Sequence, residues 1–433
     1  MARTFGRILI AATAIALSTG SIVGQRAPKA KPAAKSAATV APYQCVQRFE
    51  AKDWSILLAG MKTVNAAAVQ KLYDDEEYRT GQINNLKQIF SFSCQAVKDG
   101  MLNDPAAGGE VANIRSEITA SEFEKIANKG TKVAPLSTVS KERVAAFYKV
   151  LGNEAKFQTF LNIKVEMLSR QSTGTKPTVS DEEKAAAREA FAKISLLAAD
   201  SRLKAAAIDP GFAARVGMTV KLQQAQFLSR LFVESKIDQI NVTDDEVAGY
   251  ITKHPELQPV DVKAKADSLL KRARAGEDFA KLADENSDDP GNNAPGGGKN
   301  GGLYADVAEG KMIPAFEATA LALEPGAVSP VLTETDYGYH IIKLEKKSGR
   351  AGGTGFAKLT YDVRHILISN AVKDPANPGG RDVPVKEYVR GLIEDQKNAA
   401  LSEKTLANNP VVLADIPPDV PAKPATGPKK PRH

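Results

Sequence analysis

The stretch that decides the fold is residues 310–344, GKMIPAFEATALALEPGAVSPVLTETDYGYHIIKL. A helix is expected to begin at Pro314, because proline is favoured in the first helical turn, and to end at Pro325-Gly326. Short runs rich in apolar residues then predict strands at 328–332 and 339–344. A helix followed by strands indicates a mixed α+β module.

The pattern on either side extends this module over about residues 260–370. Apolar residues from Ala266 to Ala273 predict a short helix ended by Gly276, and a second helix begins near Phe279. A Gly/Asn/Pro loop follows at 286–302. Another strand is expected within 356–368, where alternation is clearest, and a last helix at 384–400.

The region from about 50 to 255 is predicted to be helical. One apolar stripe has helical spacing and consists of Ile83, Leu86, Phe90, Val97 and Met101. The sequences SDEE at 180–183 and TDDE at 243–246 are capping boxes, which mark helix starts. We therefore predict an α+β protein, with a helical domain at 43–257, a mixed domain at 258–370 and a C-terminal helix and strand at 384–410 that pack on the helical domain.

The composition excludes a collagen-like chain, a fully disordered chain and a multi-span membrane protein. The chain has 433 residues, 43% apolar and 25% charged, which is ordinary for a globular protein of two or three domains. The net charge of +7 arises at the two ends, since residues 1–42 carry +6 and residues 416–433 carry +3. The chain between them carries −2, so the basic balance does not indicate a nucleic-acid partner.

The N-terminus has the features of an export signal. Arg3 and Arg7 precede an apolar run at 8–17 that is too short to span a bilayer comfortably, and small residues follow. We predict a signal peptide at 1–24 and a periplasmic protein without stable membrane insertion, with an uncleaved anchor as the alternative. Residues 25–42 and 415–433, rich in Pro, Lys and Ala, are predicted to be a disordered linker and tail.

The chain has two cysteines, Cys45 and Cys94. Export would permit a disulfide between them, but Cys94 also lies on the apolar stripe, so a buried free thiol is equally compatible. The four histidines do not have metal-ligand spacing, and no phosphate-binding loop is present. No metal and no cofactor are therefore expected.

An ordered series of motifs runs through residues 276–344. It comprises Gly276-Glu-Asp-Phe279, Asn286-Ser-Asp-Asp289, Gly301-Gly-Leu303, Gly310-Lys-Met312, Ala315-Phe316-Glu, Leu323-Glu-Pro-Gly326 and Gly338-Tyr-His340. In this order and spacing the series resembles the parvulin family of peptidyl-prolyl cis–trans isomerases. The resemblance implies a small antiparallel sheet with surrounding helices and isomerase activity on X-Pro bonds.

The chemistry of this reaction requires no nucleophile or metal. Prolyl isomerisation crosses a barrier of about 18–20 kcal/mol, because amide resonance is broken as the bond twists. A catalyst needs an apolar pocket for the proline ring and polar groups that favour the twisted amide. Met312 and Phe316 are four residues apart on a helix and so share a face. The resemblance implies that they form the pocket with Leu303; ordinary core packing is the alternative for all three.

The resemblance also implies the polar site residues. They are His340 and His365, Asp289 at a position that holds Cys or Asp in the family, and Thr333, with Thr335 as a rival. If the two histidine strands are neighbours, the imidazoles can face each other across the ladder. The alternatives are structural histidines and, for Asp289, a turn residue before Pro290.

Two departures from the family pattern are present. The family's Gly-Gly-Asp-Leu-Gly is here Gly301-Gly302-Leu303-Tyr304, so the resemblance does not predict the local backbone conformation. The family's first strand, with Arg-His-Ile-Leu, is missing at 258–262, whereas VRHILI occurs at 363–368. We interpret this as a circularly permuted domain whose first strand is supplied from 363–368. A truncated second domain copy and a chance histidine are the alternatives.

A looser resemblance links the helical region to exported foldases of the SurA and PrsA type. It rests mainly on the helix at 86–101 and on residues 243–257. It implies an isomerase and chaperone that acts on unfolded or translocating polypeptides. Two alternatives are a holdase with an inactive isomerase module and an envelope protein that uses the module for docking. The oligomeric state and the clients stay open.

Overall fold

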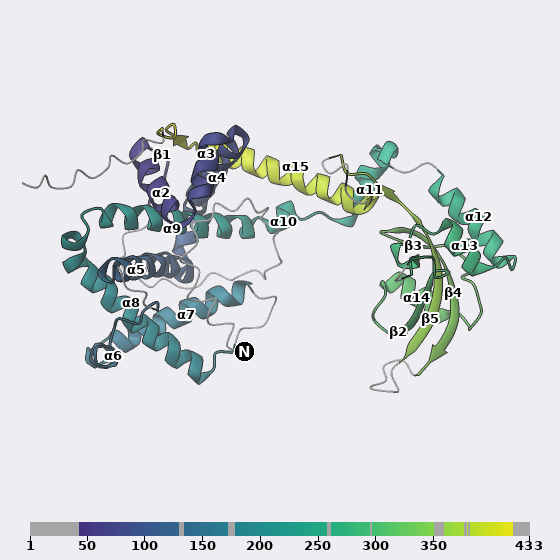
Figure 1. Ribbon diagram of the computed structural model, residues 1–433, viewed down its shortest axis with the longest axis horizontal. Helices are drawn as coiled ribbons and strands as arrows, with labels where there is room; N and C mark the ends of the chain where they lie inside the picture. The colour runs from purple at the N-terminus through teal and green to yellow at the C-terminus, as the bar shows by residue number, and fades with distance from the viewer. Residues whose placement is uncertain are drawn as a thin grey trace, which may run out of the picture. The chain divides into compact units, whose positions relative to one another are not determined.

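The computed structural model describes residues 43–129, 134–171, 178–257, 261–294, 297–349, 359–375, 379 and 382–418. The predicted signal peptide and linker, and residues 419–433 of the predicted tail, lie outside them. The described chain forms two compact units, residues 43–239 with 399–418, and residues 240–398 (Figure 1). Within the described residues, every helix is too short or too polar to cross a membrane.

The first unit is helical. Its helices are α2 (Ala51–Val64), α3 (Ala66–Asp74), α4 (Glu76–Lys98), η1 (Met101–Asn103), α5 (Pro105–Ala127), α6 (Lys141–Lys149), α7 (Asn153–Gln171), α8 (Asp181–Ile208) and α9 (Phe212–Ser235), and α10 (Ile237–Ile240) ends it. Two short strands, β1 (Arg48–Phe49) and β8 (Val412–Leu413), pair in parallel and tie the C-terminal segment to this unit.

The helices of the first unit form where the sequence predicts them. Leu86 and Phe90 of the apolar stripe are buried in α4. The Ser180–Glu183 capping box is present at the start of α8, with both reciprocal hydrogen bonds. Helices α5, α8 and α9 share one core, to which each contributes apolar side chains such as Phe123, Ile194 and Phe212.

The second unit combines helices with a four-stranded sheet. Its helices are α11 (Asp244–Lys253), η2 (Pro255–Leu257), α12 (Val262–Arg274), α13 (Phe279–Asn286), η3 (Pro290–Asn292), α14 (Pro314–Ala322) and the first part of α15 (Val385–Asn408). Its strands are β2 (Leu303–Ala308), β3 (Thr333–Thr335), β4 (Gly338–Ser348), β5 (Thr360–Ser369), β6 (Ala371–Val372) and β7 (Val383–Pro384). The sheet has the order β2-β5-β4-β3 and is antiparallel throughout, while β6 and β7 form a separate pair.

The predicted pairing of residues 363–368 with 339–344 is confirmed. Tyr339 lies opposite Ile368 and Leu344 lies opposite Val363, so β4 and β5 are antiparallel neighbours. Strand β5 is central, because β2 pairs with its other edge. The connection between β4 and β5 spans 349–359, of which 350–358 lie outside the described residues.

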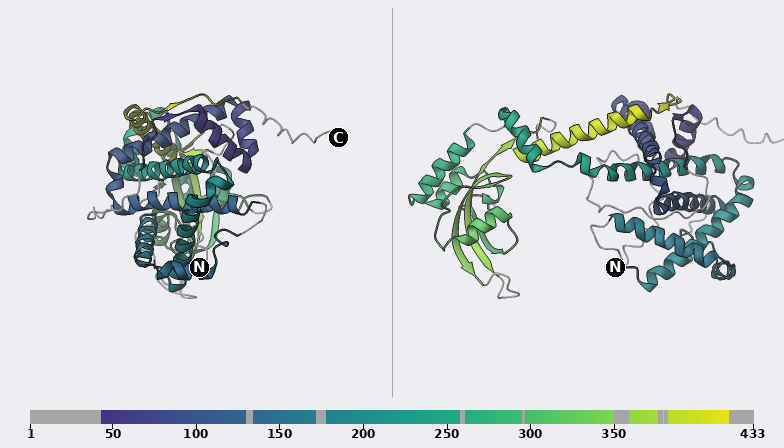
Figure 2. Two further views of the ribbon diagram at one scale, coloured as in Figure 1. Left: turned by 90° about the vertical axis from the view of Figure 1, so that its left-hand side faces the viewer. Right: turned by 180° about the vertical axis from the view of Figure 1, so that it is seen from behind.

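The two faces of the sheet carry different helices, as Figures 1 and 2 show. Ile341, Ile366 and Ile368 point to one face and pack against α12 and α13. Ile342, Leu344 and Val363 point to the other face and pack against α14. Because side chains alternate along a strand, His340 and His365 lie on the α14 face with this second group.

Two elements differ from the expectation. The strand predicted at 328–332 is absent apart from one bridge from Val328 to Lys343, and β3 begins only at Thr333. Pro330 explains the shift, because proline has no N–H to offer to a strand ladder. Helix α11, which the sequence places in the helical domain, packs in the second unit, where Val247 shares a core with Val385 and Val389.

The C-terminal helix is longer than predicted and belongs to both units. Residues 385–398 of α15 lie in the second unit, where the Arg390 guanidinium donates to the carbonyl of Val242. Residues 399–408 lie in the first unit, where the Ser91 hydroxyl donates to the Thr405 carbonyl. The following strand is β8, at 412–413, just beyond the predicted range.

The two cysteines are free thiols, of which Cys45 is exposed and Cys94 is buried. The alternative of a buried thiol on the apolar stripe therefore describes Cys94 in this structure.

Strand β5 should control the stability of the second unit. Ile366 is fully buried between β5 and α12/α13, so Ile366→Ala is expected to cost about 2–5 kcal/mol. Hydrogen exchange followed by mass spectrometry should show faster exchange in α12 and β4 and unchanged exchange in α5. Val331→Ala, at a position 65% exposed, is the control. Equal exchange in both variants would contradict the central role of β5.

Candidate active site

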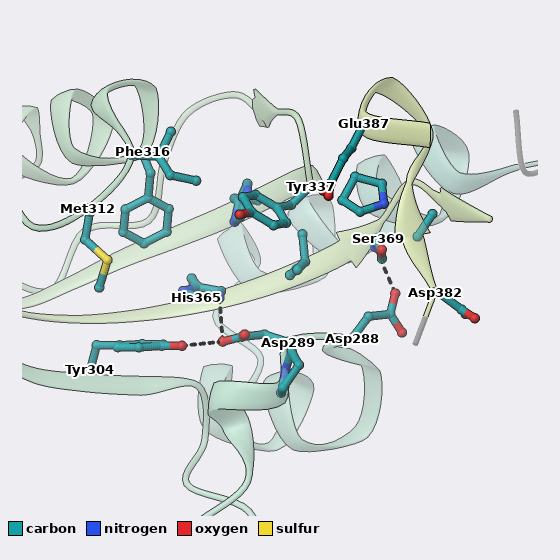
Figure 3. A pocket seen from close by; sticks show the side chains of 16 residues that line it. Asp288, Asp289, Tyr304, Met312, Phe316, Tyr337, His365, Ser369, Asp382 and Glu387 are labelled. Carbon is teal, nitrogen blue, oxygen red and sulfur yellow. Dashed lines mark hydrogen bonds and ion pairs between the residues drawn. The ribbon is translucent and has the colours of Figure 1, made fainter. Parts of the chain in front are cut away.

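A pocket of about 720 Å³ opens on the α14 face of the sheet (Figure 3). Its walls come from the loop after α13, from β2, the start of α14, the β3–β4 turn, β4, β5 and the β6–β7 hairpin. The lining residues are Asp288, Asp289, Pro290, Tyr304, Met312, Ile313, Phe316, Tyr337, His340, His365, Leu367, Ser369, Ala371, Asp382, Pro384 and Glu387.

Two histidines from neighbouring strands meet at this pocket. His340 pairs with Leu367 and His365 with Ile342, so the two histidines are diagonal neighbours on one face. Their ring centroids are 5.5 Å apart and their planes differ by 75°. The Phe316 ring meets both imidazoles edge-on, at 5.4 Å from His340 and 5.1 Å from His365. The predicted juxtaposition of the histidines is thus present.

The hydroxyl that contacts His340 belongs to Thr335. Its Oγ1 lies 2.7 Å from Nε2 of His340, whereas the Thr333 hydroxyl donates to Oγ1 of Thr319 at 3.0 Å. Thr333 is directly opposite His340 in the ladder, but Thr335 is placed diagonally, where its side chain reaches the ring nitrogen. Of the two threonines named from the sequence, Thr335 is thus the one that contacts His340.

Asp289 and Tyr304 hold the second histidine. Oδ2 of Asp289 lies 3.1 Å from Nε2 of His365, and the Tyr304 hydroxyl donates to the same oxygen at 2.9 Å. The His365–Asp289 contact is not an aligned hydrogen bond, since Nε2 makes no hydrogen bond of good geometry. The Tyr304 ring also stacks on the imidazole of His365, with centroids 5.3 Å apart and planes 14° apart.

Burial and these partners set the charges of the site. Burial opposes ionisation of Asp289, but His365, the Gly291 N–H and the Tyr304 hydroxyl outweigh it and lower the pKa to about 2. Burial lowers the pKa of His340 to about 4, and the charge of His365 acts in the same direction. Burial and the Asp289 carboxylate raise the pKa of Tyr304 to about 12. At neutral pH Asp289 is therefore ionised, while His340 and Tyr304 are neutral.

Both histidines have a buried ring nitrogen without a hydrogen-bond partner. Among the described residues, Nδ1 of His340 and Nδ1 of His365 have no hydrogen-bond partner, although the side chains are 95% and 94% buried respectively. An unpaired buried polar atom costs free energy, so a ligand that supplies the missing partner gains affinity. No group of three or more His, Cys, Asp or Glu side chains in the described chain could hold a metal ion.

Two of the three predicted pocket residues line the cavity. Phe316 does so from α14 and Met312 from the segment just before this helix, so the predicted shared helix face is wrong; Leu303 does not line the cavity. Neighbouring residues on a strand face opposite sides, and in β2 it is Tyr304 that faces the pocket. Gly302 fixes this register: at φ +69°, an added Cβ would lie 2.2 Å from the His365 carbonyl oxygen.

The sequence reasoning missed Tyr304 and Tyr337 as pocket residues. A signal for Tyr304 existed, since Leu303 and Tyr304 are consecutive and only one can face the histidines. Tyr337 lies in the β3–β4 turn and is 50% exposed. An exposed tyrosine in a turn carries no helical or strand periodicity that would have marked it.

Comparison with known families identifies this part of the chain. Residues 250–346 match the PPIC-type PPIase domain, a rotamase family. The chain contains a parvulin-type rotamase domain. The match ends at Lys346, before β5, so the strand that carries His365 lies beyond the matched residues.

Relatives of the rotamase domain are foldases and chaperones. The chain is 38% identical over 175 residues to the foldase protein PrsA of Geobacillus sp. (strain WCH70). The aligned residues make up 39% of this chain and 57% of the relative. It is 34% identical over 139 residues to the chaperone SurA of Cupriavidus metallidurans, over 31% of this chain and 27% of the relative. The chain thus spans little more than half the length of the first of these relatives.

The two threonines provide a matched test of the site. Thr335→Val should lower kcat/KM for a prolyl tetrapeptide about tenfold, because it removes one hydrogen bond that orients His340. Thr333→Val makes the same change in a residue bonded only to Thr319 and should leave kcat/KM within about twofold. Chymotrypsin-coupled assays measure both values. A larger loss in Thr333→Val would refute the assignment.

The low pKa of His340 predicts a pH-dependent contribution to stability. Its folded pKa of about 4 lies below the unfolded value of about 6.5, so the unfolded chain takes up the proton first. The stability from neutral His340 is therefore complete above pH 6.5 and is lost as the pH falls towards 4. Urea titrations should show the difference in unfolding free energy between wild type and His340→Phe falling by roughly 3 kcal/mol over this window. A pH-independent difference would contradict the pKa shift.

Proposed function

We propose that this chain is an exported peptidyl-prolyl cis–trans isomerase and chaperone that assists the folding of secreted or envelope proteins. The observation that carries the proposal is the His340–His365 pair packed on Phe316 at the floor of a pocket, because His340 and Phe316 lie within the residues that match the rotamase family. The substrates are unfolded polypeptides that contain X-Pro bonds.

The pocket has the parts that this reaction needs. Phe316 and Met312 offer an apolar surface on which a proline ring can lie. The neutral His340 and the free Nδ1 atoms present polar groups beside that surface. Such groups accelerate isomerisation if they bind the twisted amide more tightly than either planar form, and each 1.4 kcal/mol of this preference gives about tenfold in rate.

The site residues have distinct proposed roles. His340 and His365 contact the substrate amide, and Thr335 positions His340 through its hydroxyl. Asp289 and Tyr304 position His365, one by charge and the other by stacking. In this assignment Thr335 takes the role first given to Thr333.

The domain organisation is also a proposal. A helical chaperone domain precedes a parvulin domain that is circularly permuted, with β5 in the place of the family's first strand. The position of β5 beyond the matched residues 250–346, and its central place in the sheet, support this interpretation.

Several exposed apolar groups support chaperone activity in the helical unit. Leu151 and Val150, between α6 and α7, are 99% and 59% exposed. A groove of about 590 Å³ also lies along α7 and α8, where the half-buried Val165 and the edges of the buried Phe157 and Leu161 contribute to its walls. Exposed apolar surface of this kind is a binding site for the apolar side chains of unfolded chains.

The proposed location rests on the N-terminal sequence. The basic start, the short apolar run at 8–17 and the following small residues are typical of an export signal, which would deliver the protein to the periplasm. The second candidate is a holdase without isomerase activity, which the exposed apolar groups of the helical unit favour.

One pair of variants tests the isomerase and separates the two candidates. Met312→Ala should lower kcat/KM for a prolyl tetrapeptide about tenfold, because it removes apolar surface under the proline ring. Leu303→Ala, on the same β2–α14 segment but outside the pocket, should not change it. Both variants should still suppress aggregation of an unfolded client.

The outcomes are distinct. Wild-type protein that suppresses aggregation without accelerating isomerisation would establish the holdase and reject the isomerase. Equal turnover in both variants would remove the pocket from the mechanism.

A further inference from the structure

The two ends of the pocket differ in chemistry. Figure 3 shows Met312 and Phe316 at one end and Asp288, Asp382 and Glu387 at the other. Asp289 lies between the two ends, beside His365. The lining thus contains four carboxylates and no lysine or arginine.

Two of the three carboxylates at the acidic end come from segments outside the matched rotamase residues, whereas Asp288 lies within them. Asp382 precedes β7, and Glu387 lies in the first turn of α15, both after residue 346. The pairing of β6 with β7, and the hydrogen bond from the Val385 N–H to the Asn370 carbonyl, fix this hairpin at the end of β5. Asp382 and Glu387 are therefore supplied by the part of the chain that follows β5.

Of the three carboxylates at this end, only Asp382 contacts a cation. Glu387 has no hydrogen-bond or ion-pair partner among the described residues. Asp288 accepts only the backbone N–H of Ser369, at 2.9 Å. Asp382 contacts Lys373 at 3.1 Å, but this pair is mostly exposed and so contributes little. The neighbouring Lys386 pairs instead with Asp336, at 3.3 Å.

A second, independent feature shows that the same cavity is built for a ligand. Nδ1 of His340 has no partner among the described residues, although the side chain is 95% buried and lines the cavity. A polypeptide seated there would place a proline against Phe316. The residues next to that proline would then extend towards Asp288, Asp382 and Glu387.

We propose that the pocket selects prolyl peptides that carry lysine or arginine next to the proline. The proline ring occupies the end formed by Met312 and Phe316, and the cationic side chain reaches the carboxylates of Asp382 and Glu387. This inference rests on the proposed function of the site and adds a substrate class to it. Charge complementarity of this kind selects partners and is weakened by salt.

The test uses the full chain and two series of tetrapeptides. One series carries Lys, norleucine or Glu directly before the proline, and the other carries them directly after it. The Lys-to-norleucine ratio of kcat/KM is expected to be about fivefold in at least one series and to approach one in about 1 M NaCl. The Glu peptide should be the poorest substrate of that series.

Variants assign the preference to the acidic end. Glu387→Gln should lower the Lys-to-norleucine ratio about twofold, and Glu387→Gln combined with Asp382→Asn should bring it to about one. Asp395→Asn is the matched control, because Asp395 is an exposed acid two turns further along α15 that does not line the pocket. It should keep the wild-type ratio.

Binding measurements separate this inference from the proposed function. Fluorescence anisotropy of labelled Lys and norleucine peptides gives a ratio of Kd values that does not depend on turnover. If neutral peptides are turned over but the Lys-to-norleucine ratio is one both before and after the proline, the inference is overturned and the isomerase assignment stands. No turnover of any peptide would reject the isomerase, and the Kd ratio would still decide the inference. If Glu387→Gln lowers stability but leaves the Lys-to-norleucine ratio unchanged, Glu387 only stabilises the N-terminus of α15, and the inference is overturned.

Discussion

The antiparallel pairing of β4 with β5 is the constraint on which the site depends. It places His340 and His365 diagonally on one face, and the same register directs Ile341 and Ile366 to the opposite face against α12 and α13. A shift of either strand by one residue would turn its histidine to the opposite face, against α12 and α13. Asp289, Tyr304 and Thr335 then act on rings whose positions the ladder has already fixed.

Much of this arrangement could be predicted from the sequence because it follows from local periodicity. The alternation in 363–368 and 339–344 gave both strands and the shared face of the histidines, and capping boxes gave the starts of α8 and α11. Phe316 lines the pocket from α14 as expected, but Met312 precedes this helix, so its place in the pocket does not follow from helical spacing. The central position of β5 followed from one further argument. The family's first strand is missing at 258–262, and residues 363–368 can supply it.

The errors occurred where three-dimensional contacts decide between neighbouring residues. Leu303 and Tyr304 are equally plausible until the register of β2 on β5 is known. Thr333 and Thr335 are on the same face, and only the diagonal reach of a side chain distinguishes them. The boundary between the units was misplaced because α11 has a normal amphipathic pattern, and its partner, α15, lies far away in the sequence. The carboxylates of the pocket were missed for the same reason, since Asp382 and Glu387 are distant from the family-like segment.

The order of the strands also has a consequence for how this sheet can assemble. In the sheet, β4 and β5 are consecutive in sequence, and the outermost pair of their ladder joins Gly338 to Ser369. The entropy lost on closing a loop rises with its length, so the central pair of this sheet is among its least costly to bring together. If the first and last strands of a domain paired instead, the whole chain between them would have to close as one long loop. The low contact order of the β4–β5 hairpin favours rapid formation of the core, and both histidines meet as soon as this one hairpin has formed.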